Sequence, residues 1–442
     1  MHTTHYFKSK RILLNEESAF RPAILKVEYG KIAGILDYDH STPEVETVDY
    51  GELMILPGLV DTHAHINEPG RTEWEGFETA TNAAAAGGIT TVVDMPLNSI
   101  PATTTLAALE LKRETARGKC KIDYGFWGGV VPGNADELQP MIDAGVIGFK
   151  CFLIESGVDE FKMVTRQDLE IAMPVLAANH LPLIVHAELE LSSVAGIDRR
   201  YQTYLQSRPQ LWEVEAVKMM IDLCRKTGCR THIVHLSAAD ALDAIREAKK
   251  EGLPFTAETC PHYLYFDAEH IHDGETFYKC APPIREKSNQ EKLWNALKDG
   301  TIDFIVSDHS PCTPALKSLT TGDFDRAWGG IAGLQFSFQA VITAAKAHEI
   351  SIEACNRLMS LKTAKFIGIN TKGKLALGCS ADFFIFDEFL DVRVTESSVK
   401  HKHKITPYQG HQLRGTILET YLHGLKVSGT GVPHGEEIKK ST

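Results

Sequence analysis

Two histidines one residue apart stand at the end of an apolar run near the start of the chain. Residues 54–60 are apolar or glycine, and Asp61-Thr62-His63-Ala64-His65 follows them. Side chains at positions i and i+2 of a strand point to the same face, so these two imidazoles could bind one metal ion. Alone the pair is weak evidence, because many such histidines lie at surfaces or cap turns. Residues at other strand ends therefore decide its meaning.

Four further apolar runs each carry one polar residue of interest, which is a histidine or aspartate able to bind a metal ion in three of them and a lysine in the fourth. They are Lys150 in VIGFKCF, His186 in LIVHAE, His235 in THIVHLS and Asp308 in IDFIVSDH. Lysine is rarely buried without a partner, although Lys150 alone could equally bury its stem and extend its ammonium to water. Nitrogen and oxygen ligands of this kind suit divalent zinc, cobalt, manganese or iron. Several strand ends with the same chemistry predict one shared metal site.

Two of these runs contain a second candidate ligand. His232 lies three residues before His235, so the two face opposite sides of a strand, and we choose His235 because it is nearer the C-terminal end. His309 directly follows Asp308 and also faces the other way. We keep Asp308, which ends the apolar run, and leave His309 out.

These residues would converge if the runs were parallel strands of one sheet. Between about 53 and 365 the chain alternates short apolar strands with helical patterns such as 105–117 and 290–298. Strands are expected at 55–65, 90–95, 122–130, 146–152, 183–187, 231–236, 254–258 and 303–308. Alternation of this kind predicts a parallel α/β sheet, and eight units predict a closed (β/α)8 barrel of the TIM type. Such barrels carry their chemistry at the C-terminal ends of the strands.

Both ends of the chain look different from its middle. Residues 1–52 and 366–432 contain short strand-like runs separated by glycine and charged residues, which predicts a small β-sandwich domain assembled from both termini. The barrel would then span 53–365. Residues 433–442 read as a loose polar tail, and the lysine- and histidine-rich run 400–404 reads as a solvated surface patch.

Bulk composition excludes some classes of partner. The formal net charge is −12, which argues against nucleic acid or an anionic membrane as the main partner. No run reaches the length of a membrane span, and the polar N-terminus lacks the apolar core of a signal peptide. The nine cysteines include no CxxC pair and read as reduced, mostly buried thiols. We therefore expect a protein of the cytoplasm.

The motifs together resemble those of the cyclic amidohydrolases, a group within the amidohydrolase superfamily. The matching segments are HAH at 63–65, GFKCF at 148–152, HAE at 186–188, HLS at 235–237, ETCPHY at 258–263 and SDHSPC at 307–312. All appear in the group's order, and the resemblance covers nearly the whole chain. It implies a metal-dependent hydrolase that opens a cyclic amide, assembled as a homotetramer.

The resemblance also implies roles for six residues. His63 and His65 would bind the more buried of two divalent ions, and His186 and His235 would bind the second. Asp308 would bind the first ion, face the bridging water and act as the catalytic base and acid. Lys150, carboxylated by carbon dioxide, would bridge both ions. Zinc is the expected metal, with cobalt, manganese and iron as alternatives.

One position separates two possible substrates. In dihydroorotases, whose substrate carries a carboxylate, the residue two after the second metal histidine is an arginine, which suits carboxylate binding. Here that residue is Asn67, which cannot neutralise a carboxylate but matches amide groups. The stretches HINEPGRTEWEGF at 65–77 and DMPLNSIPAT at 94–103 likewise resemble members that act on a small cyclic ureide. Hydantoinase or dihydropyrimidinase is the next rival.

Two further readings stay open beside this one. Cys260 and His262 could form a thiol–imidazole pair for acyl transfer. A homologue without metal, acting in assembly, belongs to another functional class, and the six intact ligand positions argue against it.

Three more residues are candidates for substrate contact. Asn98 follows the second expected strand and could contact substrate or cap a turn. Gly330, in the glycine-rich segment 328–333, could let backbone amides approach a ligand, or could serve a turn. Arg285 could line the substrate cavity or be a solvated charge.

Overall fold

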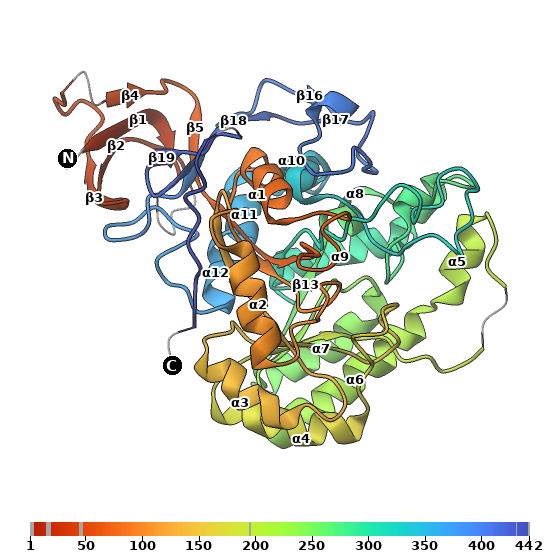
Figure 1. Ribbon diagram of the computed structural model, residues 1–442. Coiled ribbons are helices and arrows are strands. Elements are labelled where there is room, and N and C mark those ends of the chain that lie inside the picture. The colour runs from red at the N-terminus through yellow and green to blue at the C-terminus, as the bar shows by residue number, and fades with distance from the viewer. Residues whose placement is uncertain (1–3, 15–18, 44–46, 194–195, 430, 441–442) are drawn as a thin grey trace.

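A computed structural model describes residues 4–14, 19–43, 47–193, 196–429 and 431–440 of the chain (Figure 1). Its centre is a barrel of parallel strands surrounded by helices, and a second sheet lies at one side, where red strands from the N-terminal part meet blue strands from the C-terminal part. The predicted α/β barrel with a β domain built from both ends of the chain is confirmed.

The barrel strands run in parallel register around the core. In order they are β6 (Leu59–Ala64), β7 (Ile89–Asp94), β8 (Asp123–Phe126) with its continuation β9 (Gly128–Gly129), β10 (Phe149–Phe152), β11 (Leu183–His186), β12 (Thr231–Ile233), β13 (Phe255–Thr259) and β14 (Phe304–Ile305). A bridge between Ala64 and His309 joins the end of the last strand to the first. Because all strands point the same way, their C-terminal ends meet at one rim.

The helices of the chain cover the outside of the barrel and its connections. They are α1 (Phe77–Ala86), α2 (Leu106–Ala116), α3 (Ala135–Asp143), α4 (Arg166–Ala178), α5 (Tyr201–Ser207), α6 (Gln210–Thr227), α7 (Leu242–Lys250), α8 (Pro261–Tyr265), α9 (Lys287–Asp299), α10 (Ser337–Ala345), α11 (Ile352–Met359) and α12 (Leu361–Phe366). Side-chain caps fix several of their starts: Thr105 accepts from the Ala108 backbone N–H, and Thr165 forms a capping box with Asp168.

The side sheet combines strands from both ends of the chain. Its order is β19 (Leu425–Lys426), β18 (Thr416–Leu422), β15 (Phe383–Asp387), β5 (Met54–Pro57), β1 (His5–Ile12), β2 (Arg21–Glu28) and β3 (Lys31–Leu36), with β4 (Thr47–Asp49) paired to β1. Two short strands, β16 (Val392–Arg393) and β17 (Gln412–Leu413), pair separately. Phe7, Phe383 and Tyr421 pack their rings together in a small core on this sheet.

One predicted strand is two strands in the structure. We predicted a single barrel strand at 55–65, but β5 belongs to the side sheet, and the barrel begins only with β6. Gly58 separates them: its N–H bonds to the Asp382 carbonyl, and a Cβ there would overlap Thr90. The apolar run is continuous because both strands are buried, so hydrophobicity alone could not reveal the break.

The C-terminal segment is not a loose tail, which corrects our prediction. Ile438 donates its N–H to the Tyr124 carbonyl, and Tyr124 donates to Glu436. Arg113 Nε lies 2.7 Å from Glu437 Oε1. This polar segment therefore lies along β8 and adds backbone hydrogen bonds to that barrel strand.

The run 400–404 is not a solvated patch either. His401 is fully buried, and the Lys402 side chain donates to the backbone carbonyls of Thr72 and Glu75. His403 bonds to the Glu73 carbonyl at 2.7 Å. This run therefore packs on segment 72–75, which follows the first barrel strand.

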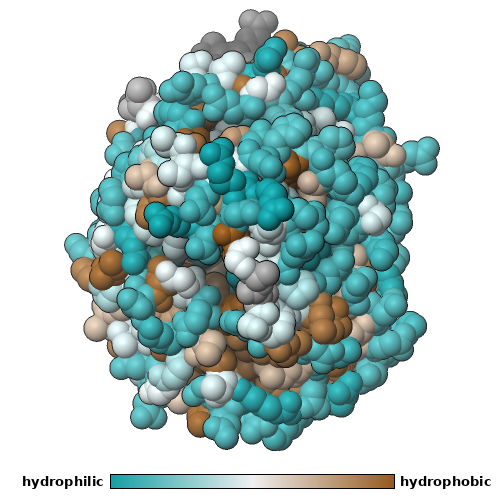
Figure 2. Space-filling view, turned by 90° about the vertical axis from the view of Figure 1, so that its right-hand side faces the viewer, coloured by the Kyte–Doolittle hydropathy of each residue, from teal (hydrophilic) through white to brown (hydrophobic). Residues whose placement is uncertain are grey.

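The surface and the thiols agree with an ordinary globular protein. All nine cysteines are free and buried, as predicted. Within the described part of the chain, no helix is long and apolar enough to cross a membrane. The face shown in Figure 2 is mostly hydrophilic, and its hydrophobic residues form scattered groups.

Candidate metal centre

The residues predicted from the strand ends converge on one cavity at the C-terminal rim of the barrel. The cavity has a volume of about 420 Å³. Its lining includes His63, His65, Lys150, His186, His235 and Asp308, with Asn98 beside them. All six predicted ligand positions are buried. His309 is not part of the lining; its ring lies 3.5 Å from Glu75.

His63 is held by a carboxylate on the side away from the cavity. Its Nδ1 lies 2.5 Å from Glu258 Oε1, and the other oxygen of Glu258 lies 3.1 Å from His232 Nε2. His63 Nε2 is buried and has no hydrogen-bond partner. An imidazole with one nitrogen on a carboxylate and the other free has the arrangement that metal-bound histidines adopt.

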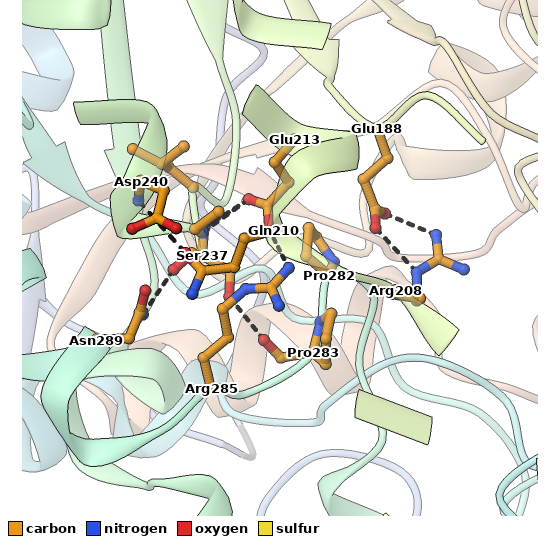
Figure 3. Close-up of polar contacts among 12 residues, drawn as sticks. Glu188, Arg208, Gln210, Glu213, Ser237, Asp240, Pro282, Pro283, Arg285 and Asn289 are labelled. Atoms are coloured by element: carbon orange, nitrogen blue, oxygen red, sulfur yellow. Dashed lines mark hydrogen bonds and ion pairs between the residues drawn. The ribbon is translucent and has the colours of Figure 1, made fainter. Parts of the chain in front are cut away.

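His186 is held in the same way through its other nitrogen. Its Nε2 lies 2.7 Å from Glu188 Oε2, which leaves Nδ1 as the remaining ring nitrogen. Arg208 donates two hydrogen bonds to Glu188, of 3.0 and 2.6 Å (Figure 3). Burial would raise the pKa of Glu188, but the Arg208 charge brings it below its ordinary value. Glu188 therefore stays ionised as an acceptor for His186.

His65 and Asp308 complete the group nearest to His63. The ligand atoms of His63, His65 and Asp308 all lie within 4.8 Å of one another. Burial would raise the pKa of Asp308, but His63 and His65 hold it below its ordinary value. On the other side of the His65 ring, Nδ1 lies 3.4 Å from Asn98 Nδ2.

Lys150 is completely buried on β10. Its Nζ has no hydrogen-bond partner, although the ring of Phe152 lies below it with its centroid 4.9 Å away. Burial lowers the pKa of this lysine to about 8. A buried ammonium without a partner is costly, so the site favours a neutral or modified amine.

These features fit a divalent cation. The cavity brings together imidazole nitrogens and carboxylate oxygen, which are ordinary ligands for such ions. His63 Nε2, His235 Nδ1 and Lys150 Nζ are buried polar atoms without a partner. Buried polar atoms normally have partners, so this concentration of unsatisfied atoms is what a site prepared for a ligand requires.

Two other groups of possible ligands were found in the described residues. One is Cys260 and His262 with Asp308. Neither Cys260 nor His262 lines the cavity, and burial raises the pKa of the Cys260 thiol well above its ordinary value, which disfavours a thiolate nucleophile.

The second group, Asp123, Asp382 and His423, surrounds a lysine. Lys372 Nζ lies 2.5 Å from an oxygen of each aspartate. The lysine pairs with both carboxylates and His423 pairs with Asp123, so this cluster is an ion-pair network.

Polar contacts from Glu213, Arg285 and Asn289 fix the segment after His235 (Figure 3). Glu213 accepts the backbone N–H of Ser237 at 3.0 Å and pairs with Arg285 at 2.6 Å. Ser237 Oγ donates to the Pro283 carbonyl, and Asn289 donates to the Ser237 carbonyl. Arg285 is therefore neither a solvated charge nor part of the cavity lining.

Two loops of the cavity wall are joined by a lysine. Lys317 is buried, and its Nζ donates to the carbonyls of Lys279, Trp328 and Gly330. Gly330 is not part of the lining; a Cβ there would overlap the Ser310 carbonyl, so the glycine serves close packing.

Asn67 also lies outside the lining. Its Nδ2 donates to the Pro311 carbonyl at 3.2 Å, and its Oδ1 is buried without a partner. Of the three predicted substrate contacts, only Asn98 reaches the cavity.

We did not predict from the sequence the residues that orient the two histidines, His63 and His186. Glu188 and Glu258 stand in the motifs HAE and ETCPHY, so a signal for them existed: an acid close to each predicted ligand or strand end. Arg208 and Glu213 lie on or beside a helix far from the motifs, and no local pattern marks them.

Comparisons with known proteins were made on the whole chain. The sequence model of the protein family described as "Amidohydrolase family" matches residues 54–427 of this chain. The chain is 46% identical to the allantoinase of Streptomyces avermitilis, covering 96% of this chain and 95% of that one. It is 41% identical to the allantoinase of Arabidopsis thaliana, covering 97% and 89%.

Solved structures of related enzymes have the same fold. The L-hydantoinase (dihydropyrimidinase) from Arthrobacter aurescens superposes with a TM-score of 0.91 at 30% identity, covering 98% of this chain and 99% of that chain. The dihydropyrimidinase from Brevibacillus agri superposes with a TM-score of 0.89 at 27% identity, covering 99% of each.

Proposed function

The chain belongs to the amidohydrolase family, and from this premise we propose that it is an allantoinase. It hydrolyses the cyclic amide of allantoin to allantoate. The reaction itself opens the ring without releasing nitrogen, and it is one step of the purine catabolism that supplies nitrogen for assimilation. The observation that carries this function is the similarity to relatives named allantoinase: 46% identity to a bacterial one, 41% to a plant one and 41% to the one of Saccharomyces cerevisiae, each over 94% or more of the chain.

The metal centre of the proposal follows the general property of the family, whose members bind divalent cations. His63, His65 and Asp308 would hold one ion, and His186 and His235 a second, with zinc as the expected metal. When bound, such ions lower the pKa of water toward ~7 and polarise the carbonyl that is attacked. The free Nε2 of His63 and the carboxylates behind His63 and His186 support this assignment.

Lys150 is proposed to carry a carboxyl group. Its neutral amine attacks the carbon of carbon dioxide, so an N–C bond forms, one C=O electron pair moves to oxygen, and one N–H proton leaves to water. The product is a carbamate, whose oxygens would be able to act as ligands of a cation, whereas an ammonium has no acceptor. Burial, which lowers the pKa of Lys150 to about 8, favours the amine that this reaction needs.

Asp308 is proposed as the group that moves the proton. Its carboxylate lies at the cavity and stays ionised, so it can accept a proton from the attacking water. It then returns the proton to the ring nitrogen as the C–N bond breaks. Asp308 and the histidines beside it are buried, and burial strengthens electrostatic interactions between such groups.

The cations around the cavity favour a substrate without a carboxylate. Arg208 is paired with Glu188, Lys279 donates to the carbonyls of Asp325 and Ala327, and Arg326 lies 3.6 Å from Asp323. Arg208 and Lys279 thus already have hydrogen-bond acceptors, whereas Arg326 is mostly exposed and makes only a long contact with Asp323. Dihydroorotate, the substrate of the rival activity, would need a cation for its carboxylate.

A substrate panel tests the proposal. The protein is loaded with zinc in bicarbonate buffer and assayed on allantoin, dihydroorotate, hydantoin and dihydrouracil. We expect the highest kcat/KM for allantoin. A higher kcat/KM for any of the other three would reject allantoinase in favour of that activity, and no turnover by protein that holds its metal would favour a non-catalytic homologue.

The remaining parts of the proposal concern the oligomeric state, the location and the domain boundaries of the protein. We propose a homotetramer in the cytoplasm, by resemblance, which light scattering of the purified protein tests. We also propose a terminal β domain of 1–57 with 366–432, which moves its first boundary past β5, and a barrel domain that follows it.

A further inference from the structure

We propose that Asn98 positions the ring of His65 for metal binding, by accepting a hydrogen bond from its Nδ1–H. The inference rests on the metal centre proposed above and assigns a role there to Asn98. Asn98 follows β7 and is 1% exposed. In the structure its Nδ2 lies 3.4 Å from His65 Nδ1, and its Oδ1 is buried without a partner.

The other ligand histidines show what this contact must provide. His63 and His186 each place one ring nitrogen on a carboxylate, Glu258 and Glu188 respectively. A carboxylate can only accept, so the contacted nitrogen carries the proton and the other nitrogen has its lone pair free for a cation. In both cases the partner fixes which nitrogen is the ligand.

At His65 the partner is an amide, which can donate or accept. His65 Nε2 lies 3.6 Å from Asp308 Oδ1, so it is the nitrogen that faces the ligand group. If Nε2 binds a cation, Nδ1 of His65 carries the proton and is a hydrogen-bond donor. In the present orientation of the amide, Nδ2 of Asn98 would then place a second donor next to this Nδ1–H. A half-turn of the amide exchanges Nδ2 and Oδ1 in almost the same volume. Oδ1 then accepts from Nδ1–H, so the metal-bound state uses the oxygen that otherwise has no partner.

The backbone of Asn98 is held so that this contact persists. Its φ is 68°, a left-handed conformation that asparagine, aspartate and glycine tolerate best. Arg71 Nη1 donates to the Asn98 carbonyl at 2.8 Å, and Arg71 itself pairs with Glu160 and lies over the Trp74 ring. This anchor holds the backbone of Asn98 in place beside His65.

Two substitutions that suit this backbone test the role. Asn98→Asp keeps an acceptor at His65, and Asn98→Gly removes it, and neither strains a left-handed residue. Zinc affinity is measured by competition with a chelator, together with the visible absorption of cobalt-loaded protein. We expect Asn98→Gly to lower the affinity for one of the two zinc ions about 10–100-fold, and to change the visible absorption spectrum of the cobalt-loaded protein. Asn98→Asp should restore an affinity close to that of the natural protein.

Asn67→Gly is the matched control. Asn67 also has a left-handed backbone, with φ 65°, and lies two residues from His65, but its side chain bonds to the Pro311 carbonyl. We expect this variant to keep the zinc affinity of the natural protein. A loss equal to that of Asn98→Gly would show a general loosening of the loop and reject the specific role of Asn98.

The outcomes separate this inference from the function on which it rests. If the natural protein binds no divalent ion, the metal centre itself is rejected. If it binds two ions and Asn98→Gly binds them equally well, only the role of Asn98 is rejected. A variant with normal metal affinity and a raised KM would assign Asn98 to the substrate instead.

Discussion

At the scale of the residue, the sharpest prediction concerns Asp308. Replacing it by asparagine keeps an oxygen and the side-chain shape but removes the base that accepts a proton. We expect Asp308→Asn to retain most bound metal and to lose about 10²–10⁴-fold in kcat, the usual contribution of a general acid–base group. Steady-state kinetics and metal analysis of the same preparation check both parts.

Asp303→Asn serves as its control. Asp303 precedes the same strand, β14, at the opposite end from the cavity, and pairs with Lys249 at 2.7 Å. The same chemical change there should leave kcat close to that of the natural protein. A metal-replete Asp308→Asn enzyme with near-normal kcat would remove Asp308 from the mechanism.

The sequence predicted which strand-end residues would meet in the candidate site, although their role as metal ligands remains a proposal. His63, His65, Lys150, His186, His235 and Asp308 all line the cavity, because a residue at the C-terminal end of a parallel strand reaches the same rim whatever its neighbours are. Asn67 and Gly330 do not line it. The positions of these two residues depend on loop packing, which spacing along the chain does not determine.

At the scale of the element, the C-terminal segment gives a prediction against its appearance in the sequence. Deleting residues 433–442 removes the segment's two backbone hydrogen bonds with Tyr124, one each to the carbonyls of Cys120 and Gly145, the bond from the Glu436 N–H to Asp123, and the contact of Glu437 with Arg113. At about 1 kcal/mol for each of these six interactions, we expect roughly 6 kcal/mol of lost stability. Chemical denaturation of the two proteins measures it.

A point variant shows whether the backbone or the charge matters. Glu437→Gln keeps the backbone pairing and loses only the ion pair with Arg113, so it should cost much less than the deletion. A truncated protein as stable as the full chain would mean that the segment contributes nothing to β8.

The fold was predictable where patterns are local, and less so where pairing is distant. Each barrel strand was expected near its observed position because buried parallel strands are short apolar runs bounded by helical patterns. Two elements were missed for different reasons. β5 is as apolar as β6 and differs only in its partners, while the C-terminal segment has no hydrophobic period at all.

At the scale of the whole molecule, a buried ion cluster connects the side sheet to the barrel. His423 follows β18, and its Nε2 lies 3.0 Å from Asp123 at the start of β8. Lys372 and Asp382 complete the cluster. The hydrogen bond to Asp123 raises the pKa of His423 above its ordinary value.

This raised pKa gives stability a pH dependence with a definite sign. A histidine with a higher pKa in the folded than in the unfolded protein stabilises the fold through its charge. This stabilisation is complete at pH values below the unfolded pKa of ~6.5, and it is lost as the pH rises through the folded pKa. His423→Asn tolerates the left-handed backbone there, with φ 51°, and removes the charge. We expect it to cost roughly 1 kcal/mol at pH 6 and little at pH 9, measured by denaturation.

An exposed histidine provides the comparison. His40→Asn, in a surface turn, should change stability equally little at both pH values. If His423→Asn destabilises the protein by the same amount at pH 6 and pH 9, the charge of His423 does not contribute, and the effect is one of shape.

The side sheet also sets the order in which the protein can be completed during its synthesis. β5 ends at Pro57, and its partner β15 starts only at Phe383, so the ribosome must make nearly the whole barrel before these strands can pair. At about 5–20 residues per second, that leaves one edge of an apolar strand open for tens of seconds. Open edges invite pairing with other chains. The edge of β5 therefore stays open until β15, in about the last seventh of the chain, has been made, and the side sheet closes late in synthesis.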